Sequence, residues 1–166
     1  MTSSADQNNQ SVARHFEIPL KHTVLIRCSP ERVYQTLTSS EGWDSWFTQG
    51  TELDLKSGGR IQLRWKDFGP DKLTVEDGGP VLEFEENKYF SFQWNPQGIE
   101  DPTTVRFTLD ERPGTDAGPY CRLTVEERGF LTTMEGQQAF QSCATGWGEA
   151  CTLLKFYLEH GITYSK

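Results

Sequence analysis

The chain has 166 residues, and its 24 acidic against 16 basic side chains give a formal net charge of −8. This length favours one domain with a sizeable core, and the lack of any Lys/Arg cluster argues against nucleic acid and anionic membranes as partners. No apolar run approaches the ~18 residues of a membrane span, and the first eleven residues lack the basic start and apolar middle of a secretory signal. We therefore expect a cytoplasmic protein.

The chain begins with a polar stretch without pattern, residues 1–14, which predicts a disordered tail in front of a single domain over residues 15–166. Residues 16–28 then alternate between apolar and polar side chains. This alternation predicts a long strand with one buried face.

Two short helices are expected after this strand. Ser29 and Pro30 are typical of an N-cap and a first helical position. The second helix carries Trp43, Trp46 and Phe47. Trp46 and Phe47 follow Trp43 by three and four residues, so the three rings fall on one side of the helix. Two helices of this length form no core of their own, so we expect them to cover part of a sheet.

Six further strands are predicted from alternating patterns between turn residues. They fall at residues 51–55, 61–66, 81–85, 89–95, 104–109 and 121–128. Residues 67–79 are rich in Gly, Asp and Pro and predict a long surface loop, in which Leu73 and Val75 could add a brief strand. Residues 113–119 predict a linking segment of the same kind.

The last predicted element is a long helix over residues 133–160, because apolar side chains recur there at helical spacing. Thr132 and Glu135 match a capping box, and Gly161 follows the end. Such a helix is roughly 40 Å long. Gly146 and Gly148 inside it predict either a close backbone contact or a bend.

This order of elements predicts an α+β fold. Strands with one apolar face need a cover, and the C-terminal helix is the only element long enough to supply it. We expect a curved antiparallel sheet of about seven strands around that helix.

Short motifs along the chain support this architecture. They are Ser29-Pro30-Glu31-Arg32-Val33-Tyr34, Trp46-Phe47, Gly58-Gly59-Arg60, Gly79-Pro80-Val81-Leu82-Glu83-Phe84, Phe92-Gln93-Trp94, Gly129-Phe130, Gly146-Trp147 and Leu153-Leu154-Lys155-Phe156-Tyr157-Leu158-Glu159. In this order they resemble the helix-grip fold of the START-related (SRPBCC, Bet v 1-like) superfamily. Within it, the chain is similar to homologues of the C-terminal domain of the activator of heat-shock protein 90 ATPase. The superfamily contains lipid carriers, cyclases and co-chaperones, so the fold does not fix the function.

The resemblance implies a cavity between the long helix and the concave face of the sheet. The alternation assigns Trp65, Phe92, Trp94, Phe107 and Val125 of the sheet to its lining, with Phe140 and Trp147 from the helix and Trp46 and Phe47 at the mouth. An aromatic lining is typical of small-molecule pockets. The alternative is that the same rings fill the core completely.

Two polar residues interrupt the apolar faces of the strands, His22 and Glu127. A buried carboxylate without a partner is costly. In the superfamily's sheet the first and last strands are antiparallel neighbours. Pairing Cys28 with Cys121 would then place His22 opposite Glu127, which suggests a mutual contact that anchors a polar ligand group. The alternatives are a structural hydrogen bond, or a glutamate that reaches solvent.

The sequence contains no signature of catalysis, of a metal site or of a cofactor site, and its four cysteines lack zinc spacing. We expect them to be free and mostly buried. The leading hypothesis is a binding protein that holds an apolar or aromatic small molecule. The alternatives are a co-chaperone with a chaperone as its partner, as the resemblance implies, and a cyclase- or hydrolase-type enzyme that uses His22 and Glu127 in the same cavity.

Overall fold

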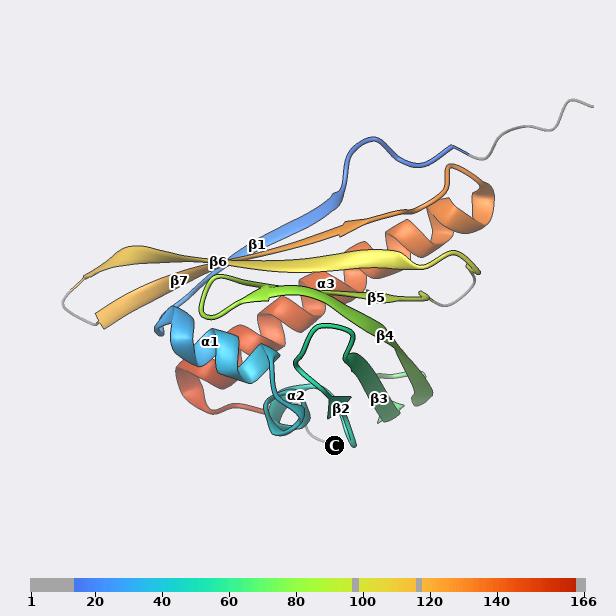
Figure 1. The fold of residues 1–166 in the computed structure, drawn as a ribbon. Helices are drawn as coiled ribbons and strands as arrows, with labels where there is room; N and C mark the ends of the chain where they lie inside the picture. The colour runs from blue at the N-terminus through green and yellow to red at the C-terminus, as the bar shows by residue number, and fades with distance from the viewer. Residues whose placement is uncertain (1–13, 97–98, 116–117, 164–166) are drawn as a thin grey trace, which may run out of the picture.

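A computed structural model describes residues 14–96, 99–115 and 118–163. Apart from Arg14, the predicted tail lies outside these residues. The fold is α+β, as predicted: an antiparallel sheet curves around one long helix, and two short helices cover one end (Figure 1).

The seven strands form one sheet in the order β1-β7-β6-β5-β4-β3-β2. Their bounds are β1 Leu20–Ile26, β2 Glu52–Leu53, β3 Arg60–Phe68, β4 Leu73–Glu85, β5 Tyr89–Trp94, β6 Thr103–Thr115 and β7 Gly118–Arg128. The first and last strands pair, as the resemblance implied. All strand pairs in the described part of the chain are antiparallel.

The three helices are α1 Pro30–Leu37, α2 Ser40–Trp46 and α3 Met134–His160. The N-cap of α3 is Thr133, whose hydroxyl accepts from the Gly136 amide, so the predicted cap at Thr132 was wrong by one residue. Gly161 ends the helix in the left-handed region, at φ 67°. The helix is continuous through Gly146 and Gly148.

The first strand is shorter than predicted. Its ladder begins at Leu20, directly after Pro19, and Ile18 is 72% exposed. Proline lacks the amide that an antiparallel ladder needs, which explains the late start. The apolar face of this strand was predicted to begin at Phe16, but only its part from Leu20 onward lies in the ladder. The Phe16 amide still donates to the Phe130 carbonyl.

The predicted loop over residues 67–79 was also wrong, because β4 already begins at Leu73 and runs for 13 residues. Gly78 and Gly79 lie within this strand. A Cβ on Gly78 would come within 2.1 Å of the Ile61 carbonyl oxygen, and one on Gly79 within 2.3 Å of the Gln93 oxygen. These glycines permit close approach of two backbones and mark no turn. Much of the predicted link over residues 113–119 likewise belongs to the β6–β7 hairpin.

The core lies between the concave face of the sheet and the helices. Its largest fully buried apolar side chains are Trp43, Phe90, Phe92, Phe107, Phe130, Ile26, Leu37, Ile61, Leu63, Leu123 and Leu154. Three cysteines are buried in the same region and the fourth, Cys143, is half-buried; all four are free, as expected.

Candidate functional site

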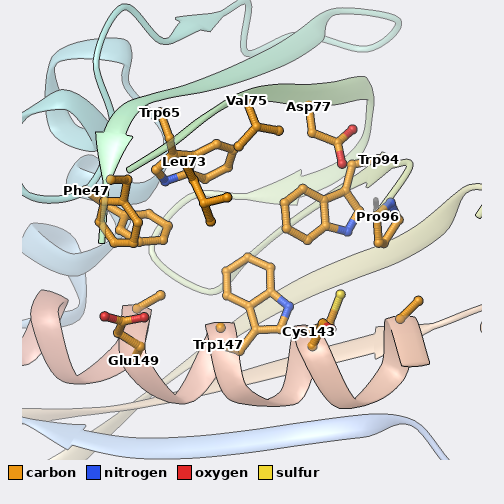
Figure 2. Close-up of a pocket in the computed structure, with 15 residues that line it drawn as sticks. Phe47, Trp65, Leu73, Val75, Asp77, Trp94, Pro96, Cys143, Trp147 and Glu149 are labelled. Atoms are coloured by element: carbon orange, nitrogen blue, oxygen red, sulfur yellow. The ribbon is translucent and has the colours of Figure 1, made fainter. Parts of the chain in front are cut away.

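A pocket of about 320 Å³ opens between α3 and the β3–β4 end of the sheet (Figure 2). Fifteen described residues line it, and most of them are apolar or aromatic. They are Phe47, Trp65, Phe68, Leu73, Val75, Asp77, Trp94, Pro96, Ala139, Ser142, Cys143, Gly146, Trp147, Glu149 and Ala150. The volume suits a ligand of one or two fused rings.

The pocket exists because the helix presents small side chains to it. Ala139, Cys143, Gly146 and Ala150 follow one another at spacings of three or four residues, so they share one face of α3. A Cβ placed on Gly146 would meet no other atom within 4 Å. Trp147 is the large side chain on this part of the helix, and Figure 2 shows its ring facing that of Trp94.

The opposite wall is a two-stranded ribbon, which we call the β3–β4 ribbon: residues 65–68 of β3 and 73–77 of β4. Among the described residues, the strands of this part of the sheet pair only with each other, since β2 pairs with β3 only at Ile61 and Gln62, and β5 pairs with β4 only from Val81 onward. Five lining residues belong to the ribbon. This wall therefore extends beyond the body of the described sheet.

Behind the pocket, the carboxylate of Glu127 holds three elements together. It accepts hydrogen bonds from the indole N–H groups of Trp94 in β5 and Trp147 in α3, both at 2.7 Å. The Thr103 hydroxyl in β6 donates to it at 2.5 Å. Glu127 itself is fully buried in β7. One carboxylate thus fixes the orientation of two tryptophans that line the pocket.

Burial raises the pKa of Glu127, and hydrogen bonds from Thr103, Trp94, Trp147 and the Cys143 thiol oppose this effect. Burial also raises the pKa of Cys143, and the neighbouring Glu127 charge adds to the rise. A thiol held in its neutral form is a poor nucleophile, so Cys143 contributes volume and a weak donor to the site.

Asp77 is the acidic group of the ribbon that lines the pocket. Its Oδ1 accepts from the backbone amides of Gly78 at 2.7 Å and Asn95 at 3.0 Å, which ties β4 to the residue after β5. Within the described part of the chain, its Oδ2 has no hydrogen-bond partner. Burial raises the pKa of Asp77, and the two amides counteract that rise. Figure 2 shows its carboxylate directed toward the Trp94 and Pro96 end of the pocket.

Four of the residues predicted to bind a ligand line this pocket: Phe47, Trp65, Trp94 and Trp147. Glu127 lies behind it, in contact with two of them. Trp46, Phe92 and Phe107 are buried in the core. Phe140 stacks on Phe16 with ring centroids 5.0 Å apart, away from the pocket lining. The rings of the sheet therefore both fill the core and border an open space.

The predicted contact between His22 and Glu127 is not formed. The register of β1 against β7 places Leu20 opposite Glu127 and His22 opposite Val125, so the predicted register was off by two residues. Cys121 faces Ile26 and not Cys28. His22 is half-buried, and its Cε1 would lie 3.9 Å from a Cβ on Gly148. The acid–base pair that the enzyme hypothesis used is absent from the described contacts.

Of the ribbon wall, only Trp65 was predicted to line the cavity, and the small-residue face of α3 was not predicted to line it. Leu73, Val75 and Asp77 alternate with Thr74 and Glu76, which is the period of a strand. Glycines nearby obscured that signal. The small residues at helical spacing are visible in the sequence.

Other kinds of site are not evident in the described ranges. No group of three or more His, Cys, Asp or Glu side chains is arranged to hold a metal ion there. None of the helices in the same ranges is both long and apolar enough to span a membrane.

The sheet, the gripped helix and the pocket between them define a helix-grip domain of the SRPBCC type. The model of the family described as "Activator of Hsp90 ATPase homolog 1-like protein" matches residues 27–159, and the chain belongs to this family. No curated protein matches the chain.

Solved structures with the same fold come from several bacteria. The Aha1 dimer from Colwellia psychrerythraea is 25% identical, with a TM-score of 0.65 over 87% of this chain and 98% of that one. Protein SSP2350 from Staphylococcus saprophyticus is 18% identical, with a TM-score of 0.65 over 89% and 96%. DynU16, a putative protein in the dynemicin biosynthetic locus, is 18% identical with a TM-score of 0.68, over 88% of this chain and 49% of that one. The last two likenesses bear on the fold alone.

Proposed function

We propose that the protein binds an apolar or aromatic small molecule in the pocket between α3 and the β3–β4 ribbon. The observation that carries the proposal is the open volume of about 320 Å³ bordered by Phe47, Trp65, Trp94 and Trp147. Small side chains on α3 keep that volume open. A protein that used only its outer surface would have no need to forgo the packing energy of a filled cavity.

Burial is the main source of affinity in such a site. A two-ring ligand that buries about 200 Å² of apolar surface gains about 5 kcal/mol at ~25 cal/mol per Å². Part of this is lost to immobilisation of the ligand, so affinity in the submillimolar to millimolar range is expected for a simple aromatic compound.

The test is a thermal-shift panel of naphthalene-, indole- and quinoline-sized compounds, with isothermal titration of those that respond. A ligand present at about 100 times its Kd should raise Tm by roughly 5 to 10 °C. The matched variants are Gly146→Leu, which would place a side chain into the pocket, and Gly146→Ala, which adds one methyl group where no atom lies within 4 Å.

We expect Gly146→Leu to fold and to lose ligand binding, and Gly146→Ala to bind nearly as well as the native chain. The proposal fails if no compound of the panel raises Tm, or if Gly146→Leu binds the responding compounds with unchanged affinity.

A co-chaperone function is the second candidate, and membership of the activator-homologue family favours it. That function would use the outer surface of the domain. Gly146→Leu should then leave any stimulation of a heat-shock protein 90 ATPase unchanged, and an ATPase assay with the native chain and this variant separates the two functions.

A further inference from the structure

The charged side chains among the described residues that line the pocket are all acidic. Among the fifteen described residues that line it there is no Lys, Arg or His, whereas Asp77 and Glu149 each bring a carboxylate. A third carboxylate, Glu127, lies directly behind the indoles of Trp94 and Trp147. The chain as a whole carries a formal charge of −8. The potential inside such a site favours a positive ligand.

The hydrogen-bond donors of the pocket are largely committed to protein acceptors. The indole N–H groups of Trp94 and Trp147 both donate to Glu127. The amides of Gly78 and Asn95 both donate to Oδ1 of Asp77. A ligand carboxylate or phosphate would therefore meet few free donors and several negative charges. Oδ2 of Asp77, by contrast, is an acceptor without a partner in the described part of the chain.

The aromatic walls of the pocket also favour a positively charged ligand. Because the N–H groups of Trp94 and Trp147 are held by Glu127, the ring faces and carbon edges of these indoles are left to border the pocket. Their centroids lie 5.4 Å apart. Trp65, Phe47 and Phe68 add further rings. Aromatic faces around a carboxylate form the usual recognition site for ammonium groups, through cation–π attraction and a charge-assisted hydrogen bond.

We propose that the pocket selects an aromatic or alicyclic amine, whose ammonium group binds Oδ2 of Asp77 while its apolar part lies between the tryptophans and the small-residue face of α3. This inference rests on the proposed function and narrows it to one chemical class. Glu149 at the rim adds a weaker, solvent-exposed attraction. Neutral aromatic compounds of the same size bind more weakly, and carboxylates bind least.

The test uses three probes of nearly equal size: 2-naphthylmethylamine, 2-naphthylmethanol and 2-naphthoate, each titrated calorimetrically into the full chain. We expect the amine to bind at least tenfold more tightly than the alcohol, and the carboxylate to bind more weakly than the alcohol. If the alcohol or the carboxylate binds as tightly as the amine, the inference is overturned and the binding function stands. If none of the three binds, the inference is overturned, and the thermal-shift panel decides separately whether the binding function survives.

The variant Asp77→Asn identifies the group responsible. Its amide oxygen can still accept from Gly78 and Asn95, so the tie between β4 and the end of β5 is kept. The matched control is Glu76→Gln, the adjacent residue on the other face of β4, where the carboxylate pairs with Arg64 outside the pocket. Both variants remove one negative charge.

Asp77→Asn should weaken binding of the amine about tenfold and leave the alcohol within twofold of its native affinity, whereas Glu76→Gln should change neither by more than twofold. Equal losses in both variants, or no loss in Asp77→Asn, would contradict the assignment of Asp77. Should Asp77→Asn fail to fold, the ranking of the three probes with the native chain still decides whether the pocket prefers a cation.

Discussion

At the scale of single residues, Glu127 has more structural consequences than any other polar side chain in the core. It lies in β7 and receives donors from β5, β6 and α3. A carboxylate can satisfy three such donors because both of its oxygens only accept. The cost of burying it is thus partly offset by hydrogen bonds that also orient the tryptophans of the pocket.

We predict that Glu127→Gln lowers the free energy of unfolding by about 1–3 kcal/mol. The amide nitrogen of glutamine would replace one accepting oxygen and so face an indole N–H, which leaves two donors opposed. Urea denaturation of the native chain and the variant measures the difference. A variant as stable as the native chain would show that the network does not stabilise the fold.

The same pair of proteins tests the protonation of Glu127. Burial raises its pKa above the ordinary value of 4.5, so the folded chain binds this proton more tightly than the unfolded chain does. The stability that this proton contributes to the folded chain is complete below about pH 4.5 and is lost as pH rises through the raised pKa. The stability advantage of the native chain over Glu127→Gln should therefore shrink as pH rises from about 4.5 through the raised pKa. An advantage that grows with pH would contradict the raised pKa.

For Glu127, the sequence predicts burial but not the partner of the carboxylate. The alternation of β7 placed Glu127 on the buried face correctly. Its partner was predicted wrongly, because β1 and β7 are joined by no tight turn and nothing local fixes their register. A shift of two residues preserves every buried face, so the apolar pattern could not reveal the error.

At the scale of secondary structure, the start of α3 offers a sharp comparison between adjacent threonines. The Thr133 hydroxyl accepts from the Gly136 amide, whereas the Thr132 hydroxyl donates to the exposed Arg14 carbonyl. Thr133→Ala should cost about 1 kcal/mol of stability through the lost N-cap, and Thr132→Ala clearly less. Chemical denaturation of both variants checks this. If Thr132→Ala lost more stability than Thr133→Ala, the N-cap would be Thr132.

The strands differ in how well sequence predicts them. All seven were predicted from alternation, although the first part of β4 was predicted as a loop with at most a brief strand, and the long helix was predicted to within a residue. The β4 side of the β3–β4 ribbon falls in the segment predicted as a surface loop, because residues 67–79 are rich in Gly, Asp and Pro and include Gly78 and Gly79. Their backbones contact Ile61 and Gln93 closely, and such a contact between strands distant in sequence leaves no local pattern.

The ribbon should also unfold locally more often than the rest of the sheet. An isolated pair of strands is marginally stable, and between Trp65 and Asp77 the described ladder joins only β3 and β4. In amide hydrogen exchange, the ribbon should exchange faster than the paired centre of β6 and β7 and should slow when a ligand is bound. Ribbon exchange that a bound ligand leaves unchanged would place that ligand elsewhere.

At the scale of the whole molecule, burial protects the four free thiols. It raises the pKa of Cys28 to about 11 and that of Cys121 and Cys151 to about 12, and raises that of Cys143 as well. We predict slow reaction with a thiol reagent in the native state near pH 8, and rapid reaction of all four in denaturant. A fast-reacting thiol in the native protein would contradict this arrangement of the core.

The two walls of the pocket differ in how they are attached to the rest of the molecule. On one side, Glu127 ties the tryptophans to β5, β6, β7 and α3, which form the body of the fold. On the other side, Phe68, Leu73 and Val75 belong to a ribbon that borders no further described strand. Substitutions at these three positions should therefore alter which ligands are accepted at little cost to folding. Under the proposed function, the ribbon wall could therefore diverge among relatives and change the shape of the pocket, while the Glu127 network that supports the fold is retained.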